Sequence, residues 1–190
     1  DKIDKIEAPI EGISGPRFSF SNVPRSGKEV VNITDLTHSY GQKILFLDAS
    51  LEVEPGDRIA FIGPNGSGKS TLLRLIMGLE KPYEGKVQLG KYNVKPGYFE
   101  QNQAEALDLN KTVLDTFFDE VPDWTQTEVR SLLGSFGLSK DSVYKEVNKI
   151  SGGEKARLAL ALLLVRPINL LILDEPTNHL DIPSKQMLEE

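Results

Sequence analysis

The sequence predicts an α/β fold, with a β-rich N-terminal part and a core sheet of parallel strands that carries an inserted helical subdomain. Three observations support this prediction. Short apolar runs bounded by Gly, Pro and Asn are typical of strands, and they occur on both sides of a helical stretch. A glycine-rich loop at 63–68 separates one such run from a helical pattern. Residues 104–148 have mainly helical spacing.

Four strands are expected around the glycine-rich region. Val30–Leu36 and Ile44–Val53 are the first two, and the Tyr40-Gly41-Gln42 sequence between them indicates a turn. Two further short strands are expected at Lys86–Leu89 and Lys95–Phe99.

The glycine-rich loop lies between a predicted strand and a predicted helix. Arg58–Ile62 is short and apolar, as expected of a strand buried on both faces. Lys69–Met77 has Leu72, Leu73 and Ile76 at helical spacing. The sequence therefore predicts a strand, a tight loop and a helix in direct succession.

Two residue pairs have the spacing of a capping box, in which a Ser or Thr caps a helix and a Glu three residues later reaches back. The pairs are Thr125 with Glu128 and Ser151 with Glu154. They predict helices over 125–136 and 151–165. The apolar run 170–173 then predicts another strand.

Composition excludes several classes of function. The 190 residues contain no cysteine, which excludes disulfides, thiolate metal sites and cysteine nucleophiles. The net charge of −6 is opposite in sign to a general phosphate-clamping surface, so any contact with nucleic acid is expected to be local or to lie elsewhere in a longer chain. No apolar run approaches the roughly 20 residues needed to cross a bilayer, so no membrane insertion is expected.

The strongest signal is a run that matches G-x-x-x-x-G-K-[ST] in the required strand and helix context. The run is Gly63, Pro64, Asn65, Gly66, Ser67, Gly68, Lys69, Ser70 and Thr71. Its glycines let backbone N–H groups point at phosphate oxygens, and the helix adds the positive end of its dipole. Lys69 is expected to reach the β- and γ-phosphates of ATP, and Ser70 to bind Mg²⁺. The alternative is a glycine-rich turn that carries a lysine by chance.

Two acids follow the last predicted strand. Asp174 and Glu175 come directly after Leu173, at the carboxyl end of a buried strand, which is the ligand-binding edge of a parallel sheet. We expect Asp174 to hold Mg²⁺ through water and Glu175 to orient or deprotonate the attacking water. The alternative is a strand that reaches solvent, where acids are common.

Together these motifs resemble the ABC type of ATPase over about residues 30–185. Its signature motif is resembled by the run Ser151, Gly152, Gly153, Glu154 and Lys155. This run lies after the phosphate loop and before the segment Leu173–Thr177, which contains the two acids, and this is the order found in the family. The capped helix and its bare glycine N–H groups form a second phosphate-binding surface. The resemblance implies that this surface meets the γ-phosphate of ATP held by a different nucleotide-binding domain, so that two domains close head-to-tail.

The resemblance implies further site residues. Tyr40 is similar to the aromatic residue that stacks on adenine, the alternative being a turn or core tyrosine. Gln101 is similar to the glutamine near Mg²⁺ and the attacking water, with Gln103 as a competing choice. Leu180-Asp181 is similar to the loop that communicates across the dimer.

Within this family, the run Glu175–Asp181 resembles the ABC-F branch, whose members are soluble, carry two nucleotide-binding domains and mostly act on ribosomes. The resemblance implies a cytoplasmic protein, or one of an organelle stroma or matrix. Residues 1–27 resemble the end of an interdomain linker, and 28–190 a nucleotide-binding domain, the second of its protein, with its helical subdomain at about 104–165. The alternatives are a membrane transporter's motor subunit and a scaffold that uses ATP only to dimerise.

One feature departs from the family pattern. The family's switch histidine is expected after a later strand, whereas the two histidines are His38 and His179, and neither fits. The sequence is therefore expected to be a C-terminally incomplete domain, with weak or no hydrolytic activity alone.

Overall fold

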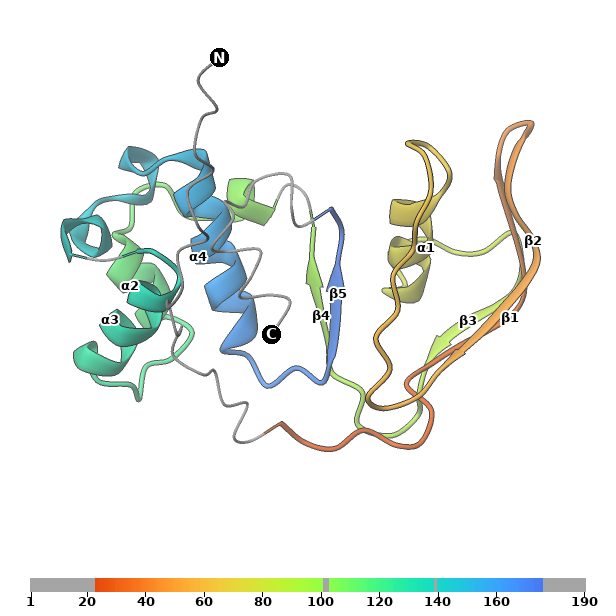
Figure 1. The fold of residues 1–190 in the computed structure, drawn as a ribbon, viewed down its shortest axis with the longest axis horizontal. Helices are drawn as coiled ribbons and strands as arrows, with labels where there is room; N and C mark the ends of the chain where they lie inside the picture. Colours follow the sequence, from red (N-terminus) through yellow and green to blue (C-terminus); the bar gives the residue numbers. More distant parts are fainter. Residues whose placement is uncertain (1–22, 101–102, 139, 176–190) are drawn as a thin grey trace, which may run out of the picture.

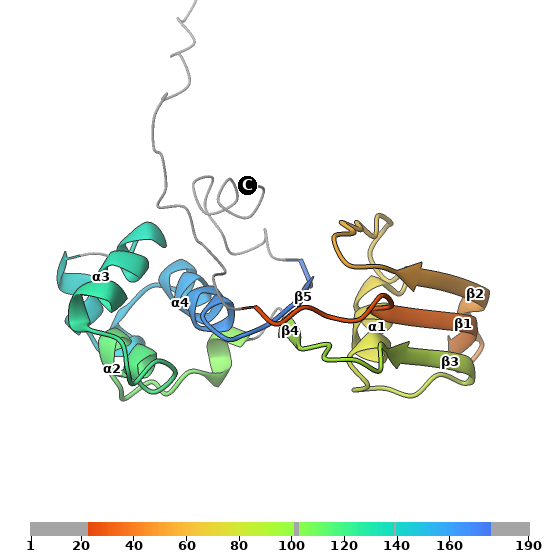
Figure 2. The same cartoon turned by 90° about the horizontal axis from the view of Figure 1, so that it is seen from below.

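The computed structural model describes residues 23–100, 103–138 and 140–175. In these ranges the chain forms a mixed α/β structure with a separate helical region, as predicted. Figure 1 shows the helical region on one side, an antiparallel sheet with one helix on the other, and a parallel strand pair between them. Figure 2, seen from below, shows the same order.

The antiparallel sheet contains three strands in the order β2-β1-β3. They are β1 (Val31–Tyr40), β2 (Lys43–Val53) and β3 (Glu84–Leu89). Val31 pairs with Val53 on one side and with Leu89 on the other, which confirms the predicted strand pair and its turn. The helix α1 (Lys69–Ile76) buries its apolar face in the same core as this sheet.

The parallel pair consists of β4 (Pro96–Phe99) and β5 (Leu170–Leu173). Pro96 pairs with Leu170, and Phe99 pairs with Leu173. Because the strands are parallel, their carboxyl ends lie at the same edge. Asp174 and Glu175 follow β5 at that edge.

The helical region has its own core, centred on Phe117 and Leu158, each fully buried. Its elements are η1 (Gln103–Ala106), α2 (Val113–Phe118), α3 (Gln126–Ser135), η2 (Lys140–Tyr144), η3 (Val147–Lys149) and α4 (Gly152–Leu164). Both predicted capping boxes are present, at Thr125 with Glu128 and at Ser151 with Glu154.

The prediction of a buried strand at Arg58–Ile62 is wrong for this structure. The segment joins neither sheet, and its apolar side chains are open to solvent, with Ile62 96% exposed. An apolar run predicts burial, but a strand also requires a neighbour with free backbone groups at the right distance. Within the described residues, the parallel sheet consists of β4 and β5, and neither strand pairs with this segment.

A single side chain holds three backbone segments together. The Asn169 amide nitrogen donates to the carbonyl oxygens of Pro24 and Asn93, each at 2.8 Å. Its amide oxygen accepts from the Lys95 N–H at 2.7 Å. The chain at 23–27 is therefore fixed to the base of both parallel strands.

No helix in the described ranges is long and apolar enough to cross a membrane.

Candidate functional site

The glycine-rich loop leads directly into α1. Gly68 is the N-cap of this helix with φ 101°, a left-handed conformation that glycine adopts without steric cost. The Leu72 N–H donates to the Gly68 carbonyl at 2.9 Å, which starts the helical bonding pattern. Leu72, Leu73 and Leu75 are buried and fix α1 against the antiparallel sheet. The loop and the open N–H groups of the helix start are thus held by a packed core.

Lys69 lies at the first position of α1 and turns back over the loop. Its ammonium donates to the carbonyl oxygens of Gly63, at 2.9 Å, and Pro64, at 3.1 Å. Within the part of the chain that the structure describes, it makes these bonds and no ion pair. The positive charge therefore lies inside the loop, where an anionic ligand would meet it.

Ser70 and Asp174 are brought together from positions 104 residues apart. The Ser70 hydroxyl donates to Asp174 Oδ1 at 3.0 Å, and Asp174 is 7% exposed. A hydroxyl and a carboxylate are hard oxygen ligands of the kind that Mg²⁺ takes. No group of three or more His, Cys, Asp or Glu residues that could hold a metal occurs among the described residues. This donor set fits Mg²⁺, which usually combines one or two protein oxygens with water and phosphate.

Tyr98 is a site residue that the sequence reasoning missed. Its hydroxyl donates to Asp174 Oδ2 at 3.3 Å. Burial, together with the negative charge of Asp174, raises the pKa of the Tyr98 phenol, so the hydroxyl stays protonated at pH values above the ordinary tyrosine pKa. The parallel register pairs Tyr98 with Ile172, two residues before Asp174. The sequence predicted both strands but not that they pair, so it gave no signal for Tyr98.

Glu175 has a strained backbone. Its φ is 47°, in the left-handed region that non-glycine residues seldom occupy. Such strain clusters at functional sites, where the surrounding structure imposes it. Glu175 and the phosphate loop line one cavity of about 260 Å³. Its lining residues are Tyr40, Lys43, Leu45, Asn65, Gly66, Gly68, Lys69, Ser70, Thr71 and Glu175.

The residues on either side of the turn between β1 and β2, Tyr40 and Lys43, also line this cavity. Tyr40, at the end of β1, is 52% exposed. Lys43, its register partner on β2, donates to the Gly66 carbonyl at 2.8 Å. Sequence reasoning selected Tyr40 and missed Lys43, although the turn places the two opposite each other.

The signature residues lie in the helical region, away from this cavity. Figure 1 shows α4 and α1 on opposite sides of the parallel strands, and Ser151, Gly152, Gly153 and Glu154 are not among the cavity's lining residues. Among the residues that the structure describes, and apart from the backbone of α4 itself, a Cβ added at Gly152 would meet no atom within 4 Å, so the start of α4 is open with respect to these residues. The structure therefore leaves this surface available to something outside the described chain.

Hydrogen bonds hold the start of α4 in its capped form. The Ser151 hydroxyl accepts from the Glu154 N–H at 3.2 Å, and Glu154 accepts from the Ser151 N–H at 2.8 Å. Burial opposes ionisation of Glu154, but bonds from Ser151 and Ser142 outweigh it and lower the pKa of the carboxyl. The stabilisation by ionised Glu154 is thus fully present above its ordinary pKa of 4.5 and is lost as the pH falls through the lowered pKa of the folded protein.

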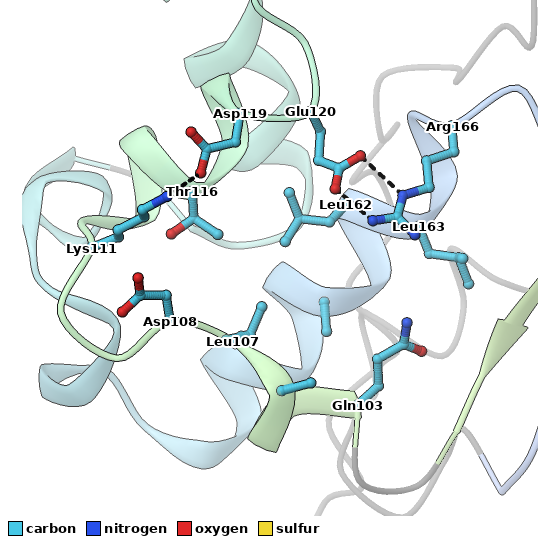
Figure 3. A pocket seen from close by; sticks show the side chains of 12 residues that line it. Gln103, Leu107, Asp108, Lys111, Thr116, Asp119, Glu120, Leu162, Leu163 and Arg166 are labelled. Carbon is cyan, nitrogen blue, oxygen red and sulfur yellow. Dashed lines mark hydrogen bonds and ion pairs between the residues drawn. The ribbon is translucent and has the colours of Figure 1, made fainter.

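The two glutamines considered for the site have different outcomes. Gln101 lies outside the described residues. Gln103 lines a second cavity of about 250 Å³ in the helical region (Figure 3). Two ion pairs border it, Lys111 with Asp119 and Arg166 with Glu120. Gln103 is therefore not brought to the phosphate loop.

A phosphate loop at a helix start, a hydroxyl–carboxylate pair for a divalent cation and a second acid in the same cavity define a P-loop nucleotide-binding domain. The family model described as ABC transporter matches residues 46–178. The chain belongs to this family, and its fold is that of an ABC ATPase domain. The predicted resemblance to the ABC type is thereby confirmed.

Relatives of the F branch are among the similar proteins, as the sequence predicted. ABC transporter F family member 5 of Arabidopsis thaliana is 56% identical over 97% of this chain, and family member 2 is 53% identical over 97%. The putative ATP-binding protein YdiF of Bacillus subtilis is 45% identical over 100% of the chain. The chain spans 27% to 29% of the length of these relatives.

Solved structures share the fold. The dimeric structure of a post-hydrolysis state of the ATP-binding cassette MJ0796, bound to ADP and Pi, superposes with a TM-score of 0.66 at 25% identity. The alignment covers 84% of this chain and 81% of that one. A bacterial Atm1-family ABC exporter with ATP bound gives a TM-score of 0.68 at 25% identity, over 87% of this chain and 32% of that chain.

Proposed function

We propose that residues 28–190 form an ATP-binding and ATP-hydrolysing domain of an ABC-F type protein, with a helical subdomain at about 104–165, and that residues 1–27 are the end of an interdomain linker. The observation that carries the proposal is the contact between Ser70 and Asp174, at 3.0 Å. It joins the phosphate loop to the acidic edge of the parallel sheet, which is the pairing that a Mg²⁺–phosphate ligand requires. The strained Glu175 in the same cavity supplies a second, separate carboxylate.

The residues around the phosphate loop have separate roles in this proposal. Bound Mg²⁺ would neutralise charge on the phosphates, with Ser70 and Asp174 as its protein ligands. Lys69 would exchange its two carbonyl partners for β- and γ-phosphate oxygens, which are stronger acceptors. Glu175 would orient the attacking water and take its proton. The remaining loop residues, Gly63 to Thr71, would supply backbone N–H groups to the phosphates.

The signature surface is proposed to complete the site of another domain. Ser151 and Gly152 lie at the start of α4, and Figure 1 shows α4 on the opposite side of the parallel strands from α1, the helix that begins at Lys69. In this proposal, one domain supplies the phosphate loop of its own site. The helix start at its signature residues supplies a second anion-binding surface to the site of another domain. This arrangement supports head-to-tail closure with a second nucleotide-binding domain, in the same chain or in a second copy. The dimeric form of MJ0796 is consistent with such closure.

We expect the change Asp174→Asn to reduce Mg²⁺-dependent ATP turnover by roughly 100-fold, because metal stabilisation of the transition state contributes several kcal/mol. The asparagine oxygen still accepts from Ser70, so the cavity keeps its shape while the charge is lost. Steady-state hydrolysis by the intact protein at increasing Mg²⁺ measures the effect.

The change Asp123→Asn is the matched control, since this acid is exposed in the helical region. Unchanged kcat and unchanged half-saturating Mg²⁺ in the Asp174→Asn protein would remove Asp174 from the metal site.

We also propose that the protein acts on the ribosome. Its compartment would be the cytoplasm or an organelle stroma or matrix. The relatives named as F family members support this step. We expect the intact Glu175→Gln protein to co-sediment with ribosomes when ATP is present and to stay in the supernatant without nucleotide. The Lys69→Ala protein is the control and should not co-sediment under either condition. If the Glu175→Gln protein bound ATP but did not co-sediment with ribosomes, the assignment as an ATPase would stand and the search for partners would turn to proteins or membranes.

A further inference from the structure

The loop that follows α1 carries a carboxylate, Glu80, whose two oxygens are both occupied. Glu80 Oε2 accepts from the Tyr40 hydroxyl at 2.5 Å, and Glu80 Oε1 forms an ion pair with Arg74, 2.9 Å from its Nε. The Glu80 side chain is 19% exposed, whereas its two partners, Arg74 and Tyr40, are 46% and 52% exposed. A carboxylate shared in this way ties the end of β1 to the helix that follows the phosphate loop.

The Tyr40 ring is restrained on another side by His38. The two rings pack edge to face, with centroids 5.3 Å apart and an interplanar angle of 84°. His38 is 8% exposed, and neither of its ring nitrogens has a hydrogen-bond partner among the described residues. His38 Nε2 lies 3.8 Å from Glu80 Oε2, too far for a hydrogen bond. His38 therefore acts on Tyr40 through packing, while Glu80 holds the hydroxyl.

The position of Glu80 is itself set by the end of α1. The Leu79 N–H donates to the Arg74 carbonyl and the Gly78 N–H to the Leu75 carbonyl, at 2.9 and 3.0 Å. These are the two bonds of a Schellman motif, which requires the left-handed backbone seen at Gly78, with φ 69°. The turn directs the chain back so that Glu80 faces Arg74 of the same helix. The link from Lys69 to Glu80 is thus a rigid helix and a defined cap.

We propose that Glu80 is a positioning residue for the nucleotide base: it fixes the Tyr40 ring in the lining of the phosphate-loop cavity before the nucleotide arrives. This inference rests on the proposed function. A half-exposed tyrosine would otherwise lose side-chain freedom on binding, and prior restraint removes that cost. The ion pair of Glu80 with Arg74 connects the Tyr40 ring to α1, so the contacts to the base and to the phosphates keep a fixed spacing.

The test separates base contacts from phosphate contacts. We expect Glu80→Ala in the intact protein to bind ATP about 5- to 10-fold more weakly, the cost of having to immobilise one more side chain on binding. Affinity for inorganic tripolyphosphate, which has no base, should stay within about 2-fold of wild type. Competition calorimetry with both ligands measures the two effects. The change Glu84→Ala, in an exposed glutamate at the start of β3, is the matched control.

A double-mutant comparison gives a readout that a general structural defect would not give. Tyr40→Phe removes the hydroxyl alone, so it should weaken ATP binding by a similar factor, and Glu80→Ala should add little to it. Glu80→Gln keeps an acceptor and should recover ATP affinity to within about 3-fold of wild type. If Glu80→Ala lowers the melting temperature severely, the Tyr40→Phe protein replaces it as the test.

Equal losses for ATP and tripolyphosphate would overturn the inference, because Glu80 would then act through the phosphate loop. Unchanged ATP affinity in both Glu80→Ala and Tyr40→Phe would overturn it as well. If the wild-type protein bound neither ligand, the proposed function itself would fail, and this result differs from the first two.

Discussion

Replacing Lys69 with alanine is expected to abolish measurable ATP binding, with a loss in affinity of at least about 100-fold. The ammonium lies inside the loop, within 2.9 Å of the Gly63 carbonyl and 3.1 Å of the Pro64 carbonyl. It is therefore already placed to donate to phosphate oxygens. Hydrogen bonds to charged acceptors contribute about 1.5–3 kcal/mol each, and the proposed contacts involve two phosphates. Calorimetric titration of the intact protein with ATP and Mg²⁺ measures the loss.

Two controls separate charge from loop structure in the Lys69→Ala experiment. Lys69→Arg keeps the charge but cannot place one compact donor between two phosphates, so only partial recovery is expected. Lys91→Ala removes an exposed lysine after β3 and should have no effect. Wild-type affinity in the Lys69→Ala protein, with its melting temperature unchanged, would refute the assignment of the phosphate loop.

The change Glu175→Gln is expected to stop turnover while ATP stays bound. Loss of a general base costs about 100- to 10,000-fold in rate. Glutamine has nearly the same shape as glutamate, so the backbone at φ 47° and the cavity lining are expected to persist. The ATP-bound protein should then accumulate in the closed, paired form. Single-turnover hydrolysis, together with size-exclusion chromatography in ATP, follows both consequences.

A comparison with Asp174→Asn assigns the two carboxylates to separate roles. The metal-site variant should show an altered Mg²⁺ requirement, whereas Glu175→Gln should retain the wild-type Mg²⁺ requirement for ATP binding. Turnover near the wild-type rate in Glu175→Gln would show that another group activates the water.

The helix starts were predictable because their determinants are local. Thr125 with Glu128 and Ser151 with Glu154 form capping boxes in which every bond joins residues three apart. The start of α1 at Lys69 was predictable for the same reason, since the left-handed Gly68 precedes it. A short segment contains all the information that such features need.

Features that depend on distant neighbours were not predictable in the same way. The apolar run at 58–62 was predicted as a strand, but its hydrogen bonding depends on which strand lies beside it. Likewise, the sequence singled out Tyr40 by resemblance but gave no indication that Glu80, 40 residues later, holds its hydroxyl. Tyr98 was missed because its role arises from the parallel register with β5.

The three hydrogen bonds of Asn169 imply a mechanical connection between the start of the described chain and the acidic edge of the sheet. Asn169 is the residue immediately before β5, and its side-chain amide donates to the backbone carbonyl oxygens of Pro24 and Asn93. A force on residues 23–27 would therefore act at one end of β5, and Asp174 follows the other end of this strand. Movement of residues 23–27 would then displace the Asp174 carboxylate, and movement of Asp174 when the site closes around a nucleotide would displace residues 23–27.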